Sequence, residues 1–175
     1  MIREIKVTNN QIWYARDKIM KVVFNNNLDE CKFGSDLERT FFGYLGQKVV
    51  VDHLSGAEDT DDFEFDVSWR SKRIEVKTIS CRAEPRMDYL CTVNSPVEGE
   101  GMRKQDADFY VFLRIAYYMS RSWVCGFIPC DEFYDRGQYY NKGELNCGGV
   151  NFNKANCTVL EISKLTDIMG LKGGC

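Results

Sequence analysis

The chain has 175 residues, of which 44% are apolar and 28% charged, enough to bury one ordinary core, so we expect a single domain over residues 1–175. A formal net charge of −3 argues against strong general attraction to polyanions. The longest apolar run, residues 109–119, is interrupted by Arg114 and is too short to cross a bilayer as a helix. Because the charged N-terminus also lacks the apolar stretch of a signal peptide, we expect a cytoplasmic protein without a membrane partner.

Eight cysteines are dispersed along the chain without a C-x-x-C pair. Disulfide frameworks belong to secreted chains, and zinc or iron–sulfur sites usually use closely spaced ligand pairs. The pattern therefore favours reduced thiols that behave as small buried apolar residues, with a cysteine metal site as the less favoured alternative.

Two helical patterns open the chain. Apolar residues at helical spacing predict a helix over 11–24, with Asn9 or Asn10 as its N-cap. The segment Ser35-Asp36-Leu37-Glu38 has the pattern of a capping box, which predicts the start of a second helix. Gly46 is the predicted stop of that helix.

A strand and a hairpin are predicted next. The β-branched run 49–51 indicates a buried strand, and residues 55–60 a polar connection. Residues 63–67 and 72–78 both alternate between apolar and polar positions, so we expect a β-hairpin with its turn at 68–71. The remaining predicted elements are strands over 87–93, 109–117, 123–128 and 158–162, helices over 129–134 and 163–169, and a loop over 94–101.

Charge is segregated around this hairpin. The acidic residues that precede or open it are Glu58, Asp59, Asp61, Asp62, Glu64 and Asp66, and the basic residues that follow are Arg70, Lys72, Arg73, Lys77, Arg82 and Arg86. A metal site beside a phosphate-binding surface would divide charge in this way, and so would a solvated acidic loop followed by a basic hairpin.

The hairpin can bring three ionisable side chains together. Glu75 and Lys77 point to one face of their strand and can meet Asp66 from the partner strand. Asp66 and Glu75 are oxygen ligands of the kind that Mg²⁺ prefers, while Lys77 can position a water nucleophile or stabilise charge at phosphorus. Together they meet the needs of phosphodiester hydrolysis. The alternative is an ordinary exposed charge pair, and Glu64 is an accessory candidate on the face of Asp66.

The order of Asp66, a short turn and Glu75-Val76-Lys77 resembles the motif of the PD-(D/E)XK nuclease superfamily, over roughly residues 35 to 128 by element order. The resemblance implies an α/β, restriction-endonuclease-like fold in which helices flank a mixed central β-sheet. It also implies the backbone carbonyl of Val76 as a further metal ligand and Glu38 as a glutamate that the preceding helix contributes to the catalytic site. The capping box explains Glu38 equally well without catalysis.

The function implied by the resemblance is that of a Mg²⁺- or Mn²⁺-dependent deoxyribonuclease, in particular an endonuclease, from a phage, a bacterium or an archaeon. DNA would be its partner, and a homodimer is expected by analogy because two cuts need two sites. One alternative is a non-catalytic nucleic-acid-binding or assembly protein that retains the nuclease fold. Another is a nuclease that acts on RNA and differs only in its substrate.

Overall fold

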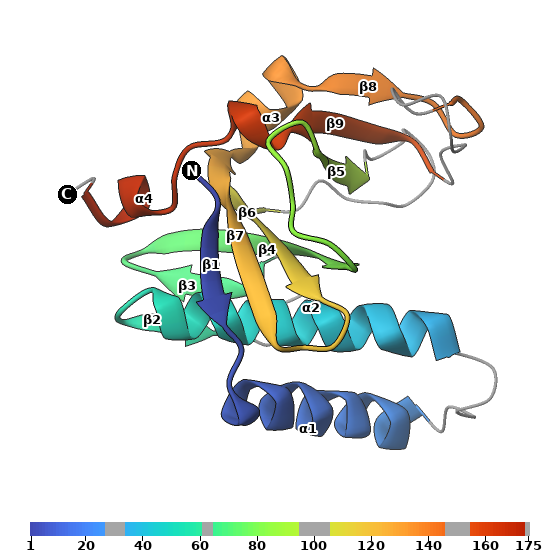
Figure 1. The fold of residues 1–175 in the computed structure, drawn as a ribbon, viewed down its shortest axis with the longest axis vertical. Coiled ribbons are helices and arrows are strands. Elements are labelled where there is room, and N and C mark those ends of the chain that lie inside the picture. Colours follow the sequence, from blue (N-terminus) through green and yellow to red (C-terminus); the bar gives the residue numbers. More distant parts are fainter. Residues whose placement is uncertain (27–33, 61–64, 95–105, 146–154, 174–175) are drawn as a thin grey trace.

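The structure, a computed structural model, describes residues 1–26, 34–60, 65–94, 106–145 and 155–173 (Figure 1). In chain order the elements are β1 (Arg3–Lys6), α1 (Asn9–Asn26), α2 (Gly34–His53), β2 (Ala57–Asp59), β3 (Val67–Trp69), β4 (Lys72–Cys81), β5 (Leu90–Asn94), β6 (Phe109–Ala116), β7 (Arg121–Pro129), α3 (Cys130–Arg136), β8 (Gln138–Tyr140), β9 (Cys157–Glu161), the 3₁₀ helix η2 (Ile162–Lys164) and α4 (Met169–Gly173).

The strands form two sheets. The larger sheet has six strands in the order β1-β7-β6-β4-β3-β2, and the smaller one has three in the order β5-β9-β8. Strands β4 and β6 are parallel, whereas the other neighbouring pairs are antiparallel. The fold is therefore a mixed α/β arrangement around a mixed sheet, as the sequence predicted at this level. Among the described residues no helix is long and apolar enough to span a membrane.

The larger sheet is covered on both faces. Figure 1 shows α1 and α2 stacked on one side of it and the smaller sheet on the other. The core under α2 joins Val49 and Val50 of the helix to Ile74 and Val76 of β4. The opposite core gathers aromatic and sulfur-containing side chains of β6, β7 and α3 with the smaller sheet. Strand β4 thus presents Ile74 and Val76 to the layer of α2, while the residues that alternate with them point to the other face of the sheet.

Helix α2 corrects two predictions made from the sequence. It runs through Gly46 to His53, so Gly46 does not end the helix and residues 49–51 are not a strand. Gly46 instead lets the helix approach the sheet, because a Cβ atom built there would lie 1.9 Å from Oγ1 of Thr78. The β-branched residues 49–51 continue the helix, and the first two of them are buried against the sheet. The side chains of the predicted capping box at 35–36 lie outside the described ones.

The hairpin is present with a shorter turn than predicted. Arg70 and Ser71 alone connect β3 to β4, both with positive φ, and Trp69 pairs with Lys72 beside them. The predicted turn at 68–71 was therefore too long, since residues 68 and 69 belong to β3. Two consecutive left-handed residues are typical of the type I′ turns that join antiparallel strands. The predicted strand 63–67 is wrong at residues 65 and 66, which precede β3, so only Val67 of this range lies in a strand. Residues 63 and 64 lie outside the described residues.

Most of the other predicted elements are confirmed with small shifts of their ends, namely α1, β4, β5, β6, β7, α3 and β9. The N-cap of α1 is one residue earlier than predicted: Thr8 and Gln11 exchange side chain and backbone hydrogen bonds as a capping box. The predicted helix 163–169 is wrong, because η2 and α4 occupy only its ends. The connection 55–60 contains β2, and the edge strands β1 and β8 were not predicted. The predicted loop 94–101 lies almost wholly outside the described residues.

Candidate active site

The β3–β4 hairpin brings the three predicted side chains together. Asp66 lies immediately before β3, and its N–H donates to the carbonyl oxygen of Ile74 at 3.0 Å. Its carboxylate then accepts a hydrogen bond of 2.7 Å from the N–H of Val76. This hydrogen bond holds the side chain of Asp66 against the backbone of β4, beyond the end of β3. The side chain also lies next to Glu75.

Glu75 and Lys77 form an ion pair on the face of β4 that points away from α2. The Nζ atom of Lys77 lies 2.7 Å from Oε1 of Glu75, with the side chains 26% and 9% exposed respectively. Nζ also lies 5.8 Å from the ring centre of Tyr110 on the neighbouring strand. The site is therefore enclosed on the sheet side, while the lysine retains access to solvent.

Burial and the second carboxyl group change the acidity of Asp66. Burial is the main cause that raises the pKa of Asp66 to about 7, and the charge and hydrogen bonding of Glu75 act in the same direction. The hydrogen bond from Val76 and the charge of Lys77 lower this pKa without reversing the shift. The two carboxyl groups therefore compete for ionisation, which is the electrostatic situation that a bound cation relieves.

The oxygen donors at this site match a hydrated Mg²⁺ or Mn²⁺ ion. Two carboxylates suffice for an ion that keeps several of its waters. Since the N–H and C=O groups of one strand residue point to the same side, the carbonyl of Val76 faces the side where its N–H meets Asp66. Among the described residues, no group of three or more His, Cys, Asp or Glu side chains forms a metal-binding cluster. The fit therefore relies on the two carboxylates and this backbone oxygen.

Glu38 is not brought to this group. Its side chain is exposed and lines a shallow hollow with Ile79 and Ser80, beyond the site along β4. Gln47 is the residue of α2 that donates a hydrogen bond to the carbonyl oxygen of Asp66. Glu38 lies nine residues before Gln47 in the same helix, which corresponds to about 13 Å along the helix axis. The capping-box alternative for Glu38 depends on the side chain of Ser35, which lies outside the described ones. Glu64, the accessory candidate, also lies outside the described residues.

Two tyrosines complete the surroundings of Glu75. Tyr110 is fully buried, and its hydroxyl lies 3.0 Å from that of Tyr134 on α3. Burial, this hydrogen bond and the charge of Glu75 all raise the pKa of Tyr110, so its hydroxyl stays neutral. Strand alternation in 109–117 could have shown that Tyr110 faces the site, because it pairs in register with Glu75.

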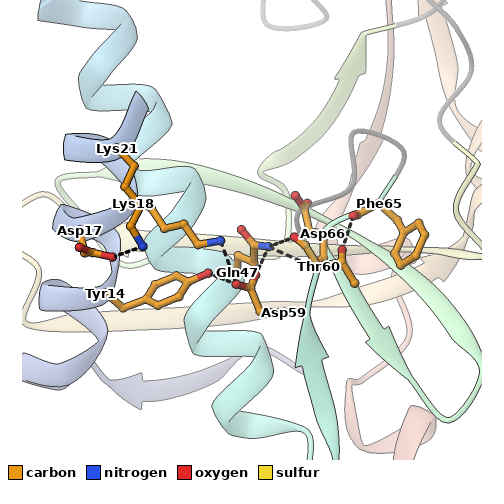
Figure 2. A network of polar contacts seen from close by, with 9 residues as sticks. All are labelled: Tyr14, Asp17, Lys18, Lys21, Gln47, Asp59, Thr60, Phe65 and Asp66. Carbon is orange, nitrogen blue, oxygen red and sulfur yellow. Dashed lines mark hydrogen bonds and ion pairs between the residues drawn. The ribbon is translucent and has the colours of Figure 1, made fainter. Parts of the chain in front are cut away.

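Gln47 was missed by the sequence interpretation. It is only 4% exposed, and its Nε2 donates to the carbonyl oxygen of Asp66 at 2.7 Å (Figure 2). The available signal was a polar residue between the buried positions 45 and 49 of one helix. That signal disappears when Gly46 is taken as the end of the helix, because residue 47 then falls in a connection.

No family model and no curated protein sequence matches the chain. The functional conclusion therefore has to come from the site itself.

Proposed function

We propose that the chain is a divalent-metal-dependent nuclease that hydrolyses DNA phosphodiester bonds. Asp66 and Glu75 would be the metal ligands and Lys77 the catalytic lysine. The observation that carries the proposal is their convergence at one end of the hairpin, where the Lys77–Glu75 contact of 2.7 Å lies beside the half-buried Asp66. Glu38 has no part in the proposal, because it lies further along the sheet.

Each residue would have its own role in hydrolysis. Asp66, Glu75 and the carbonyl oxygen of Val76 would hold the cation, which when bound supplies Lewis-acid chemistry at the phosphate. Lys77 keeps a positive charge near the reacting phosphate, where it orients the attacking water and stabilises the negative charge that grows on the phosphate oxygens. The water oxygen bonds to phosphorus as the bond from phosphorus to the leaving oxygen breaks; the water gives up one proton to solvent, and the leaving oxygen takes up a proton from solvent.

The arrangement of elements supports the finer fold proposal, a restriction-endonuclease-like core. Helix α2 precedes the hairpin and covers one face of the mixed sheet, and the strand that bears Glu75 and Lys77 lies inside that sheet between β3 and β6. Endonuclease action follows from the same resemblance. A homodimer that acts on both strands of a duplex remains a prediction, which sedimentation of the protein with and without DNA tests.

The direct test is cleavage of supercoiled plasmid and of linear DNA by purified protein with Mg²⁺ or Mn²⁺, with and without EDTA. Glu75→Gln should abolish cleavage. Glu4→Gln is the matched control, because Glu4 also lies on a strand of the larger sheet and has a cationic neighbour, Arg121, at 3.6 Å. Cleavage that survives EDTA, or that Glu75→Gln leaves unchanged, would sink the proposal.

The same experiment separates the alternatives. DNA bound without cleavage, and without stabilisation of the protein by Mn²⁺ in a thermal melt, would favour the non-catalytic nucleic-acid-binding or assembly protein. Cleavage of single-stranded RNA with no cleavage of DNA would identify a ribonuclease with the same site.

A further inference from the structure

A polar network centred on the buried Gln47 joins the two helices to the segment that carries Asp66 (Figure 2). At its centre, Nε2 of Gln47 donates to the carbonyl oxygen of Asp66 at 2.7 Å and to a carboxylate oxygen of Asp59. The carbonyl oxygen of Thr60 lies at 3.4 Å from the same nitrogen. Three acceptors around one nitrogen identify it as the amide nitrogen, because a carbonyl oxygen in this place would repel all of them.

Asp59 links this glutamine to α1. Its second carboxylate oxygen accepts from the hydroxyl of Tyr14 and lies 3.1 Å from Nζ of Lys18. The side chains of Lys18 and Asp59 are 15% and 26% exposed, so this ion pair is largely shielded from water. Asp59 therefore has charge compensation from α1 and presents its other oxygen to Gln47.

Two hydrogen bonds of Thr60 join the end of β2 to residues 65 and 66. The N–H of Thr60 donates to the carbonyl oxygen of Asp66 at 3.1 Å, and the hydroxyl of Thr60 donates to the carbonyl oxygen of Phe65 at 2.7 Å. The backbone of Asp66 is thus bonded on the α2 side by Gln47, while its carboxylate is bonded by Val76 on β4. Both ends of the residue are fixed.

We infer that Gln47 is a positioning residue for Asp66, oriented by Asp59 and supported from α1 by Tyr14 and Lys18. The inference rests on the proposed function for its catalytic consequence, because Asp66 is there a metal ligand. A ligand that can shift by a fraction of an ångström binds its ion less tightly. Loss of Gln47 should therefore weaken metal binding first and slow cleavage as a result.

The experiment compares Gln47→Met with a matched control, Gln11→Met. Gln11 is also 4% exposed, and its Nε2 also donates to an aspartate, Asp52, at 2.9 Å, so its loss likewise removes an amide–carboxylate hydrogen bond of a buried glutamine, in this case between α1 and α2. Gln11 does not touch the hairpin. Three quantities are measured in each variant: the Mn²⁺ concentration for half-maximal cleavage, the cleavage rate at saturating Mn²⁺, and hydrogen exchange at the Val76 amide.

We expect Gln47→Met to raise the half-maximal Mn²⁺ concentration at least tenfold and to accelerate exchange at the Val76 amide at least tenfold, with a smaller loss of rate at saturating Mn²⁺. The control should stay within about twofold of wild type on all three, even if both variants melt at similarly lowered temperatures. If Gln47→Met does not fold, Asp59→Asn keeps the shape of the carboxylate and should move the same quantities in the same direction by less.

The failures can be told apart. If the wild type cleaves and Gln47→Met matches Gln11→Met in Mn²⁺ requirement and amide exchange, the positioning role is wrong and the nuclease proposal stands. If the wild type neither cleaves nor binds Mn²⁺, the proposed function fails, and exchange at the Val76 amide alone decides whether Gln47 positions Asp66.

Discussion

The two faces of β4 differ in what they meet. On one face Ile74, Val76 and Thr78 pack beneath α2, close enough that only a glycine fits at position 46. On the other face Glu75 and Lys77 pair with each other next to Tyr110. Since these residues alternate along one strand, the packing of Ile74 and Val76 under α2 fixes the register of β4. This register in turn keeps Glu75 and Lys77 on the opposite face. We therefore expect substitutions on the charged face to act mainly on cleavage, and substitutions on the packed face to act mainly on folding.

The largest expected effect lies on the charged face. Lys77→Met should lower the single-turnover cleavage rate on the order of 10²- to 10³-fold, as when one charge-stabilising group is removed from an active site. The fold should survive, because the Lys77 side chain is at the margin of the site and 26% exposed. Lys21→Met is the control, since it removes the exposed Lys21–Asp17 pair on α1. Equal rates in the two variants would remove Lys77 from the chemistry.

The stability of the metal-free protein should depend on Asp66 in a defined pH window. The pKa of Asp66 is about 7 in the folded chain against 3.8 for an unperturbed aspartate, so between these values the folded state holds a proton that the unfolded state has lost. Its contribution to stability is thus fully present below pH 4 and is lost as the pH rises to 7. The loss should be on the order of 4 kcal/mol.

Urea unfolding of wild type and Asp66→Asn at a series of pH values measures this contribution as the difference between the two curves. The difference should change across pH 4 to 7 without metal and become flatter with Mn²⁺, which favours the carboxylate form. A difference that does not change with pH would mean that Asp66 ionises normally beside Glu75.

On the packed face, we expect alanine to change the stability of the protein in opposite directions at two glycines of α2. Gly46→Ala should destabilise the protein by about 1 to 3 kcal/mol, because its Cβ would meet Thr78. Gly43→Ala should stabilise it by roughly 0.5 to 1 kcal/mol, because nothing lies within 4 Å of its Cβ position and alanine is the better helix former. Thermal melts of both variants, and recovery of stability in Gly46→Ala with Thr78→Ala, test the contact. Stabilisation by both alanines would exclude it.

The same contact explains what the sequence could not predict. A glycine after an apolar helical stripe is a normal stop signal, and only the approach of β4 shows that Gly46 is a packing residue. Gln47 and the strand-like run 49–51 were misplaced as a consequence. Strand β1 was missed for a related reason: it is a short edge strand whose partner, β7, lies more than a hundred residues away.

The charged face was predictable because its geometry is local. Alternation puts Glu75 and Lys77 on one side of a strand, and a hairpin brings Asp66 beside them within a dozen residues. The predicted turn was two residues too long, but the pairing that matters lies beyond it. Glu38 could not be placed in this way, because its distance from the site depends on where α2 crosses the sheet.

The smallest expected effect tests the two-residue turn between β3 and β4. Ser71 has φ of 61°, a conformation that glycine adopts without strain, so Ser71→Gly should raise the free energy of unfolding by about 0.5 to 1 kcal/mol. Ser68→Gly is the control, and it should lower stability because residue 68 lies inside β3. Urea midpoints measure both changes. A shift of the pairing by one residue would exchange the two faces of β4. If the two-residue turn already holds the register, Ser71→Gly leaves the cleavage rate unchanged.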